Sequence, residues 1–194
     1  MSTATYTDVL LMVQVRDGKS DFFDLLVERH RHDLVGYLYR TVQNHAIAEE
    51  LAQETFLRAY RSRGNYQPTA KFTTWLYSIA TRLAWNWIRD NRTRRHYEPL
   101  EGNSLDARPR EFTDPRPLAD ETIAHDECVR AVKQAVAELP ERQRAAVLMH
   151  KYQDMTYEEI ASVAKLTPQA VKSLLFRAHS ALRDKLSERL GVSA

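Results

Sequence analysis

The sequence is poor in the residues and patterns that would commit it to a specialised fold class. It has one cysteine and five glycines, and no stretch approaches the roughly 20 apolar residues needed to cross a bilayer. The single cysteine, Cys128, excludes an internal disulfide or a cysteine-based metal site, and we expect it to be buried in a helix. The amino terminus has no basic leader. These scarcities predict a cytoplasmic protein that does not span a membrane.

A large excess of charge is also missing, because 28 lysines and arginines face 26 aspartates and glutamates and the net charge is only +2. Any contact with nucleic acid must therefore come from local clusters of basic residues. What the sequence has instead is a helix-forming composition, with 43% hydrophobic residues and no long β-branched run. We expect an all-α fold.

Four helical patterns occupy the first half of the chain. The stretch TDVLLMVQVR ends before a stop at Gly18, and a long pattern follows Ser20, which is a candidate N-cap. A third pattern follows Asn44, and residues 71–95 form the fourth. Four helices with short loops can share one core, so we place a first small helical domain at about residues 5–96.

Residues 97–118 differ in composition from the sequence on either side. Four prolines lie between His96 and Ala119, and from Glu98 to Glu121 seven acidic residues face three arginines. This composition predicts a flexible, acidic, exposed linker. Helical patterns then resume and run to the end of the chain, so we place a second small helical domain at about residues 119–190.

Two capping signals divide the end of the second domain into a short helix and a longer one. Thr156 with Glu159 forms a capping box before YEEIASVA, and Thr167 with Pro168 is typical of the start of the next helix. This is the helix-turn-helix pattern, whose second helix enters the major groove of DNA. On a helical wheel the polar side of that second helix carries Gln169, Lys172, Ser173, Phe176, Arg177 and Ser180.

The polar side of this second helix suits DNA, because its side chains can bond base edges and phosphates. From Lys165 to the end of the chain, six basic residues face two acidic ones. Phe176 has two interpretations, which are contact with thymine methyls or sugars and packing against a neighbouring helix. An ordinary solvated face is the alternative interpretation for the whole set.

The helix after Asn44 has two contrasting stripes. One is apolar and predicts burial, with members Ala48, Ala52, Phe56, Ala59 and Tyr60. The opposite stripe combines acids, an amide and one exposed leucine, with members Glu50, Gln53, Glu54 and Leu57. Such a stripe is either solvated or a contact surface for a partner.

Residues 71–95 contain all three tryptophans and end in a run of arginines. A helical wheel places Trp75 and Trp87 on a core face with Leu76, Ile79 and Leu83. It places Trp85 on a polar face with Ser78, Thr81, Arg89 and Arg92. An aromatic ring beside arginines can stack an unpaired base while the cations hold phosphate, and packing of Trp85 under another segment is the alternative.

Two stretches on either side of the linker resemble one family. The stretch LPERQRAAVLMHKYQDMTYEEIASVAKLTPQAVKSLLFRAHSAL resembles region 4 of bacterial sigma factors. In the same way AEELAQETFLRAY, together with KFTTWLYSIATRLAWNWIRDNRTRR, resembles region 2. The chain has no room for the extra regions of the large primary sigma factors, so it is similar to the extracytoplasmic-function group.

The resemblance implies a non-enzymatic factor that binds core RNA polymerase, directs it to promoters and helps to melt them, without a cofactor or a small-molecule substrate. The upstream, minus-thirty-five element would be read by Gln169, Lys172, Ser173, Phe176 and Arg177. The β′ clamp would be contacted by Glu50, Gln53, Glu54 and Leu57, with the β subunit as a further polymerase partner. The downstream, minus-ten element and the melted strand would be contacted by Arg82, Trp85, Asn86 and Arg89. An anti-sigma factor, in such families often bound to the membrane, would hold the protein inactive.

The match is imperfect within residues 71–95. Arg82 stands where related factors often carry the asparagine of the sequence IARN, and Ser78 and Ile79 stand where primary sigma factors carry adjacent melting tryptophans. The promoter sequence therefore cannot be copied from relatives, and we expect melting to depend on different contacts.

Two other classes of function are compatible with parts of the sequence. A helix-turn-helix repressor or activator would bind duplex DNA as a dimer without polymerase. A metal-dependent enzyme would need the HRHD stretch at residues 30–33 as a ligand set, but residues two apart on a helix point to different faces, so His30 and His32 do not converge.

Overall fold

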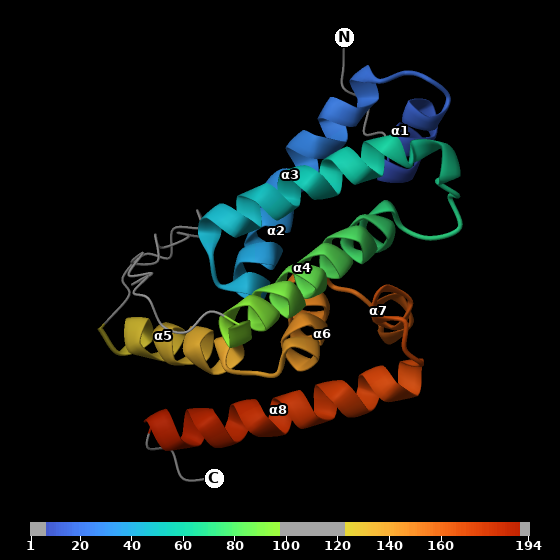
Figure 1. The fold of residues 1–194 in the computed structure, drawn as a ribbon. Helices are drawn as coiled ribbons and strands as arrows, with labels where there is room; N and C mark the ends of the chain where they lie inside the picture. Colours follow the sequence, from blue (N-terminus) through green and yellow to red (C-terminus); the bar gives the residue numbers. More distant parts are fainter. Residues whose placement is uncertain (1–6, 98–122, 191–194) are drawn as a thin grey trace. The chain divides into compact units, whose positions relative to one another are not determined.

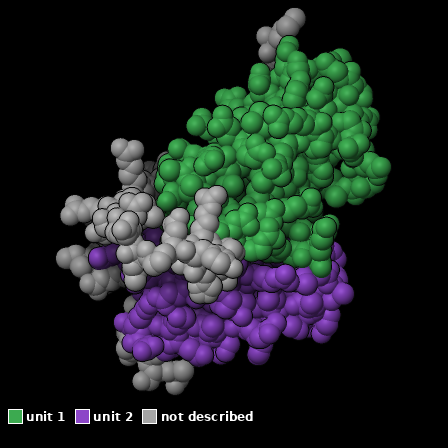
Figure 2. Space-filling view, viewed as in Figure 1, with its two compact units in different colours: residues 1–107, 162–165 green, residues 108–161, 166–194 purple. Residues whose placement is uncertain are grey.

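The computed structural model describes residues 7–97 and 123–190, so residues 98–118 of the predicted linker lie outside it. Within those two ranges the chain forms eight α-helices and one short 3-10 helix, with no β-strand, which confirms the all-α prediction (Figure 1). The chain divides into two compact units, residues 1–107 with 162–165 and residues 108–161 with 166–194 (Figure 2). In the described ranges no helix has the length and hydropathy of a membrane span.

The first unit is built around its second helix, α2 (Asp21–Val42), which contacts the other three α-helices of the unit. Its elements are α1 (Asp8–Arg16), α2 (Asp21–Val42), α3 (His45–Arg61), the 3-10 helix η1 (Arg63–Asn65) and α4 (Phe72–Tyr97). Helix α2 contacts α1, α3 and α4, and α3 and α4 also lie side by side (Figure 1). Leu26, Leu34 and Leu38 of α2 are fully buried in the core between these helices.

The ends of the helices follow local sequence signals with one exception. Asn44 accepts a hydrogen bond from the backbone N–H of Ile47 at 3.1 Å, as expected of an N-cap before α3. Gly18 has a φ of +97°, a left-handed conformation that suits glycine just beyond the end of α1. Ser20 precedes α2 but caps none of its N–H groups, because its hydroxyl donates to the side chain of Asp21 instead.

Helix α4 buries Leu76 and Leu83 as the wheel predicted, but the rest of its buried face differs from the predicted one. Its buried residues among those with described side chains are Phe72, Thr74, Leu76, Tyr77, Ala80, Thr81, Leu83 and Ala84. Thr81, expected on the polar face, shares a 2.8 Å hydrogen bond with the hydroxyl of Tyr37 on α2. Burial raises the pKa of Tyr37 to about 12, so this phenol stays neutral. The three tryptophans are all half-buried, so neither Trp75 nor Trp87 is the buried core residue that we predicted.

The shift of this face has a physical cause. Helix α4 packs against two neighbours, α2 and α3, so it buries a wider arc than a helix with a single neighbour. The ring of Tyr37 meets Tyr77 edge-on, with centroids 5.0 Å apart, and this contact draws residues 77 and 81 inward. The hydroxyl–hydroxyl bond offsets the cost of burying two polar groups.

The second unit contains α5 (Ile123–Ala137), α6 (Glu141–Tyr152), α8 (Pro168–Leu190) and the first part of α7 (Tyr157–Ala164), whose residues 162–164 are grouped with the first unit. Helix α8 packs along both α5 and α6. The buried Arg144 of α6 donates to the carbonyl of Ala137 at 2.6 Å, which satisfies an acceptor at the end of α5.

The prediction that Cys128 is buried is wrong, because its side chain is exposed. On a wheel Cys128 lies close to Ala131 and Ala135, which are both buried. It sits nearly one turn before Ala131, the first buried residue of α5 in the described part of the chain. A wheel gives the direction of a side chain about the helix axis but not how far along the axis the neighbouring helices extend.

Candidate nucleic-acid and polymerase interfaces

The two helices of the predicted helix-turn-helix begin where the capping signals placed them. The Thr156 hydroxyl accepts from the N–H of Glu159 at 3.3 Å, and the Glu159 carboxylate accepts from the N–H of Thr156 at 2.8 Å. This reciprocal pair is a capping box, and it fixes the start of α7. Thr167 accepts from the N–H of Ala170 at 3.2 Å and caps α8. Lys165, with a φ of +55°, makes the turn between the helices.

The outer face of α8, which we define as Gln169, Lys172, Ser173, Phe176 and Arg177, is exposed at every position. Phe176 is the most telling, because 75% of its surface is accessible. Packing against a neighbouring helix is therefore excluded for Phe176 within the described part of the chain. Ser173 and Arg177 bond only to backbone carbonyls of α8 itself, those of Gln169 and Ser173. The outer face thus presents side chains that the fold does not use.

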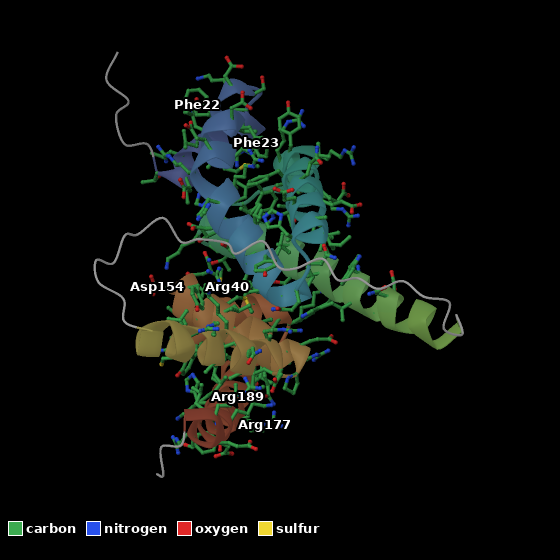
Figure 3. All side chains as sticks on the ribbon, turned by 90° about the vertical axis from the view of Figure 1, so that its left-hand side faces the viewer. Phe22, Phe23, Arg40, Asp154, Arg177 and Arg189 are labelled. Atoms are coloured by element: carbon green, nitrogen blue, oxygen red, sulfur yellow. The ribbon has the colours of Figure 1, made fainter. Side chains whose placement is uncertain are left out.

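The positive charges of α8 divide into two groups along its length. Lys185 and Arg189 both donate to Glu138, which lies in the turn directly after α5, and so join α8 to the end of that helix. These bonds hold the pKa of Glu138 below its ordinary value. Between Pro168 and Ser180 the helix has no carboxylate, while it carries Lys172 and Arg177. Figure 3 labels one arginine of each group, Arg177 and Arg189.

A groove with a cavity volume of about 850 Å³ lies between α2 and α3 in the first unit. Its floor is apolar and contains two aromatic side chains of the core, Phe23 and Phe56, whose rings meet nearly at right angles with centroids 6.3 Å apart. The ring of Tyr60 lies beside that of Phe23, with the two ring centroids 5.2 Å apart. Figure 3 shows Phe23 near the start of α2, on the side where α3 lies.

The rim of this groove is acidic. Four carboxylates line it against a single arginine, Arg31, and they are Asp21, Asp24, Glu49 and Glu50. Three of the four residues that we assigned to polymerase contact, Glu50, Gln53 and Leu57, line the groove. Leu57 is 44% exposed, which is unusual for a leucine beside an apolar floor. The fourth residue, Glu54, does not line the groove and instead accepts from Arg58 at 2.6 Å.

The residues of α4 that we assigned to the minus-ten element share one face of the helix. Arg82 and Arg89 are exposed, and Trp85 and Asn86 are half-buried between them. Arg89 also pairs with the adjacent Asp90 at 3.2 Å, and both side chains of this pair are well exposed. The structure leaves part of the Trp85 ring accessible while the rest is packed.

A second hollow, with a volume of about 400 Å³, brings Arg82 together with residues that we did not predict. It is lined by Arg58 and Arg61 at the end of α3, by Ser62 and Asn65, and by Ile79 and Arg82 of α4. The signal in the sequence was the arginine-rich stretch RAYRSRGN at residues 58–65. Sequence alone gives no reason to place that stretch beside Arg82, because the proximity arises from the packing of α3 against α4.

The HRHD stretch does not form a metal site in the described residues. Its first histidine, His30, bonds through Nε2 to Asp8 of α1 at 2.8 Å, and Asp8 also pairs with Arg29. His32 is exposed on another side of α2. Across residues 7–97 and 123–190 no group of three histidine, cysteine or acidic side chains is placed to hold a metal ion.

Comparisons with known proteins match both halves of the chain. The family description Sigma-70 region 2 matches residues 26–94, and Sigma-70, region 4 matches residues 130–182. RNA polymerase sigma-H factor of Pseudomonas aeruginosa is 31% identical over 188 residues, which cover 94% of this chain and 95% of that protein. RNA polymerase sigma factor CarQ of Myxococcus xanthus is 33% identical over 177 residues, which cover 91% and 96%.

Solved structures with the same fold are also found. The structure of CnrH in complex with the cytosolic domain of CnrY matches with a TM-score of 0.68 at 20% identity, over 93% of this chain and 97% of that chain. The sigma factor RpoE in complex with the anti-sigma factor NepR from Bartonella quintana matches with a TM-score of 0.63 at 20% identity, over 89% and 98%. At this level of identity the likeness establishes the fold.

Proposed function

Because the chain belongs to the sigma-70 family, as an extracytoplasmic-function sigma factor, we propose a division of its surfaces between RNA polymerase and promoter DNA. It is a transcription initiation factor. On this proposal residues 5–96 serve the polymerase and the minus-ten element, and residues 119–190 serve the minus-thirty-five element. Residues 97–118 are the acidic linker between them. We propose no catalytic step for the protein itself.

The observation that carries this proposal is the separation of charge between exposed surfaces. The α2–α3 groove has an apolar floor with four carboxylates and one arginine on its rim. The outer face of α8 has two cations, an exposed phenylalanine and no carboxylate. The first surface repels a phosphate backbone and suits a basic, amphipathic protein segment, whereas the second suits DNA.

We assign the α2–α3 groove to core polymerase, with Glu50, Gln53 and Leu57 as its contacts. Leu57 would bury its exposed half against the partner, and Glu50 would pair with a cation at the rim. Glu54 would contribute from outside the groove, where its bond to Arg58 holds it. The clamp of the β′ subunit is the proposed occupant, and the β subunit is the proposed further partner.

We assign the outer face of α8 to the minus-thirty-five element in duplex DNA. Lys172 and Arg177 provide donors for guanine edges or phosphates, Gln169 and Ser173 provide both donors and acceptors, and Phe176 provides an apolar contact for thymine methyls. We assign Arg82, Trp85, Asn86 and Arg89 of α4 to the minus-ten element and the melted strand. Trp85 is half-buried, and a base would have to stack on the part of its ring that is accessible.

The test is reconstituted transcription with core polymerase on a library of random promoter DNA, followed by sequencing of the transcripts. We expect transcripts that require this protein and that share two sequence elements upstream of their start sites. A gel-shift assay of the protein alone on the selected promoter is the second arm, in which we expect tight binding only when core polymerase is present. The absence of any dependent transcript, or tight specific binding without polymerase, would contradict the proposal.

We also propose that a protein inhibitor of the anti-sigma type binds this chain. The support is that the sigma factor RpoE, which has the same fold, has been solved in complex with the anti-sigma factor NepR. CnrH, also of this fold, has been solved in complex with the cytosolic domain of CnrY. The test adds candidate proteins encoded beside this gene to the transcription assay. We expect one of them to abolish the dependent transcripts while transcription by another holoenzyme continues. Inhibition of both holoenzymes alike would contradict a specific inhibitor.

A further inference from the structure

The hollow beside the end of α3 gathers positive charge from segments that are distant in the sequence. Arg58 and Arg61 come from the last turns of α3, and Arg82 comes from the third turn of α4. The other lining residues are Ser62, Asn65 and Ile79, so no carboxylate lines this hollow. Three guanidinium groups around one concave surface repel one another, and in the absence of a lining acid they favour an anion between them.

The three arginines differ in how far the fold already uses them. Arg58 donates to Glu54 on its own helix. The side chains of Arg61 and Arg82 make no hydrogen bond or ion pair to any other described residue. The neighbouring Arg63 is a contrast, because it donates to the carbonyl of Tyr60 at 3.0 Å and its guanidinium lies 4.3 Å from the centre of the Tyr60 ring. Arg61 and Arg82 therefore have their donors available for a ligand.

The chemistry of the lining favours phosphate over a carboxylate side chain or a base. Guanidinium groups bind the oxygens of a phosphodiester through paired N–H donors, and more than one of them can share a single phosphate. The amide of Asn65 can add a further donor, while the Ser62 hydroxyl already donates to the Arg58 carbonyl at 2.6 Å. In the described residues no aromatic side chain lines the hollow, so it offers no platform on which a base could stack.

We propose that this hollow holds one backbone phosphate of the promoter strand that passes along α4, with Arg58 and Arg61 as DNA-contacting residues in addition to Arg82. The inference rests on the proposed function, because it takes the ligand to be promoter DNA held in the polymerase complex. It extends the DNA surface of the first unit from one helix to two. A strand fixed between α3 and α4 would be positioned for the bases next to that phosphate to reach Trp85 and Asn86.

The test is a scan of single neutral phosphates with the complete holoenzyme. A partly opened promoter DNA, taken from the sequences selected by transcription, receives one methylphosphonate at a time along the minus-ten region. We expect one position to weaken binding by the unaltered protein roughly fivefold to tenfold. Arg61→Gln should weaken binding to the unmodified DNA by a similar factor and should lose most of its sensitivity at that same position. Arg58→Gln should behave in the same way with a smaller effect.

The control variant is Arg16→Gln, because Arg16 is an exposed arginine of the same unit that lines neither the hollow nor the groove. It should retain the full sensitivity at every phosphate. Promoter-dependent transcription by the unaltered holoenzyme is measured in parallel and establishes that the proposed function holds. If that transcription is present but Arg61→Gln stays equally sensitive at every phosphate, the hollow does not hold the strand and this inference alone fails. A loss of sensitivity spread evenly over all phosphates would also overturn it, because it would indicate general electrostatic attraction.

Discussion

Helices α3 and α8 are both amphipathic, yet their exposed sides have opposite chemistry. On α3 the exposed side carries Glu50, Gln53 and Leu57 and forms one wall of a groove with an apolar floor. On α8 it carries Lys172, Phe176 and Arg177 and is free of carboxylates over its first half. A concave apolar surface with a charged rim suits another protein, and a projecting basic helix suits the major groove. On the proposed assignment, this difference in exposed chemistry would direct the two kinds of partner to different surfaces.

The most severe test of this comparison places a charge at the edge of the groove. Leu57→Asp should weaken binding to core polymerase by about 2 kcal/mol or more, roughly 30-fold, because a carboxylate would be desolvated where an apolar contact is needed. The measurement is a titration of core polymerase with labelled protein. Leu10→Asp is the matched control, since Leu10 is 51% exposed on α1 and lies outside the groove. If both variants lost the same amount of affinity for core polymerase, the groove would not be part of the polymerase interface.

A second test compares two arginines of the same helix. Arg177→Gln should reduce use of the minus-thirty-five element by about 1.5 kcal/mol, roughly tenfold, because Arg177 is the proposed contact to DNA. Arg189→Gln should leave promoter use unchanged, because Arg189 bonds to Glu138 within the unit. The measurement is transcription from the selected promoter with and without its upstream element. Polymerase binding should be unaffected by either change, and a loss of polymerase binding by Arg177→Gln would contradict the assigned role.

A third test concerns the ends of the two helices, which are built alike although their faces differ. Asn44 caps α3 and Thr167 caps α8, each through one side-chain hydrogen bond. Alanine at either position should therefore lower the free energy of unfolding of its own unit by about 1 kcal/mol. Hydrogen exchange read separately for the two units gives the measurement. Ser20→Ala should have almost no effect, because the Ser20 hydroxyl caps no helix N–H. If Ser20→Ala lowered the free energy of unfolding as much as Asn44→Ala, the stability at these positions would depend on contacts other than the cap hydrogen bond.

The smallest effect concerns the carboxylate of Glu138, which joins the turn after α5 to α8. Lys185 and Arg189 hold the pKa of Glu138 below its ordinary value. The ionised carboxylate therefore stabilises the fold in full when the pH is above the ordinary pKa of a glutamate. This contribution disappears as the pH falls through the lowered pKa of the folded state. The melting temperature of the unaltered protein should exceed that of Glu138→Gln at neutral pH, and the difference should shrink in acid below about pH 4. Glu188→Gln is the control on α8. A difference that stays constant with pH would show that Glu138 acts through packing and not through its charge.

Much of the fold followed from local signals in the sequence. The capping pair Thr156 and Glu159 and the cap Thr167 marked the starts of α7 and α8, because these side chains bond to N–H groups only three residues away. The outer face of α8 could also be predicted, since all five of its side chains are exposed as the wheel placed them. The assignment of these faces to polymerase and DNA stays a prediction.

The features that sequence reasoning missed all depend on contacts between helices. Thr81 was expected on a polar face, but a tyrosine 44 residues earlier in the chain receives its hydroxyl in the core. Cys128 lies on the same side of α5 as Ala131 but is exposed, and Ala131 is the first buried residue among the described side chains of that helix. Arg58 and Arg61 were overlooked because nothing within their own helix relates them to Arg82. Helical periodicity gives each helix a direction, and only the packed structure shows which neighbours that direction meets.

The exposed side chains on the first half of α8 have a consequence for evolution and for engineering. Lys172 and Phe176 are exposed, and the hydroxyl of Ser173 bonds only to its own helix backbone. The contacts that hold α8 in place lie elsewhere, in residues such as Val171 and Leu175 and in the bonds from Lys185 and Arg189 to Glu138. On the proposed assignment of this face to the minus-thirty-five element, single substitutions on it would change the promoter preference with little effect on stability, which would make α8 suitable for building transcription factors that do not recognise one another's promoters.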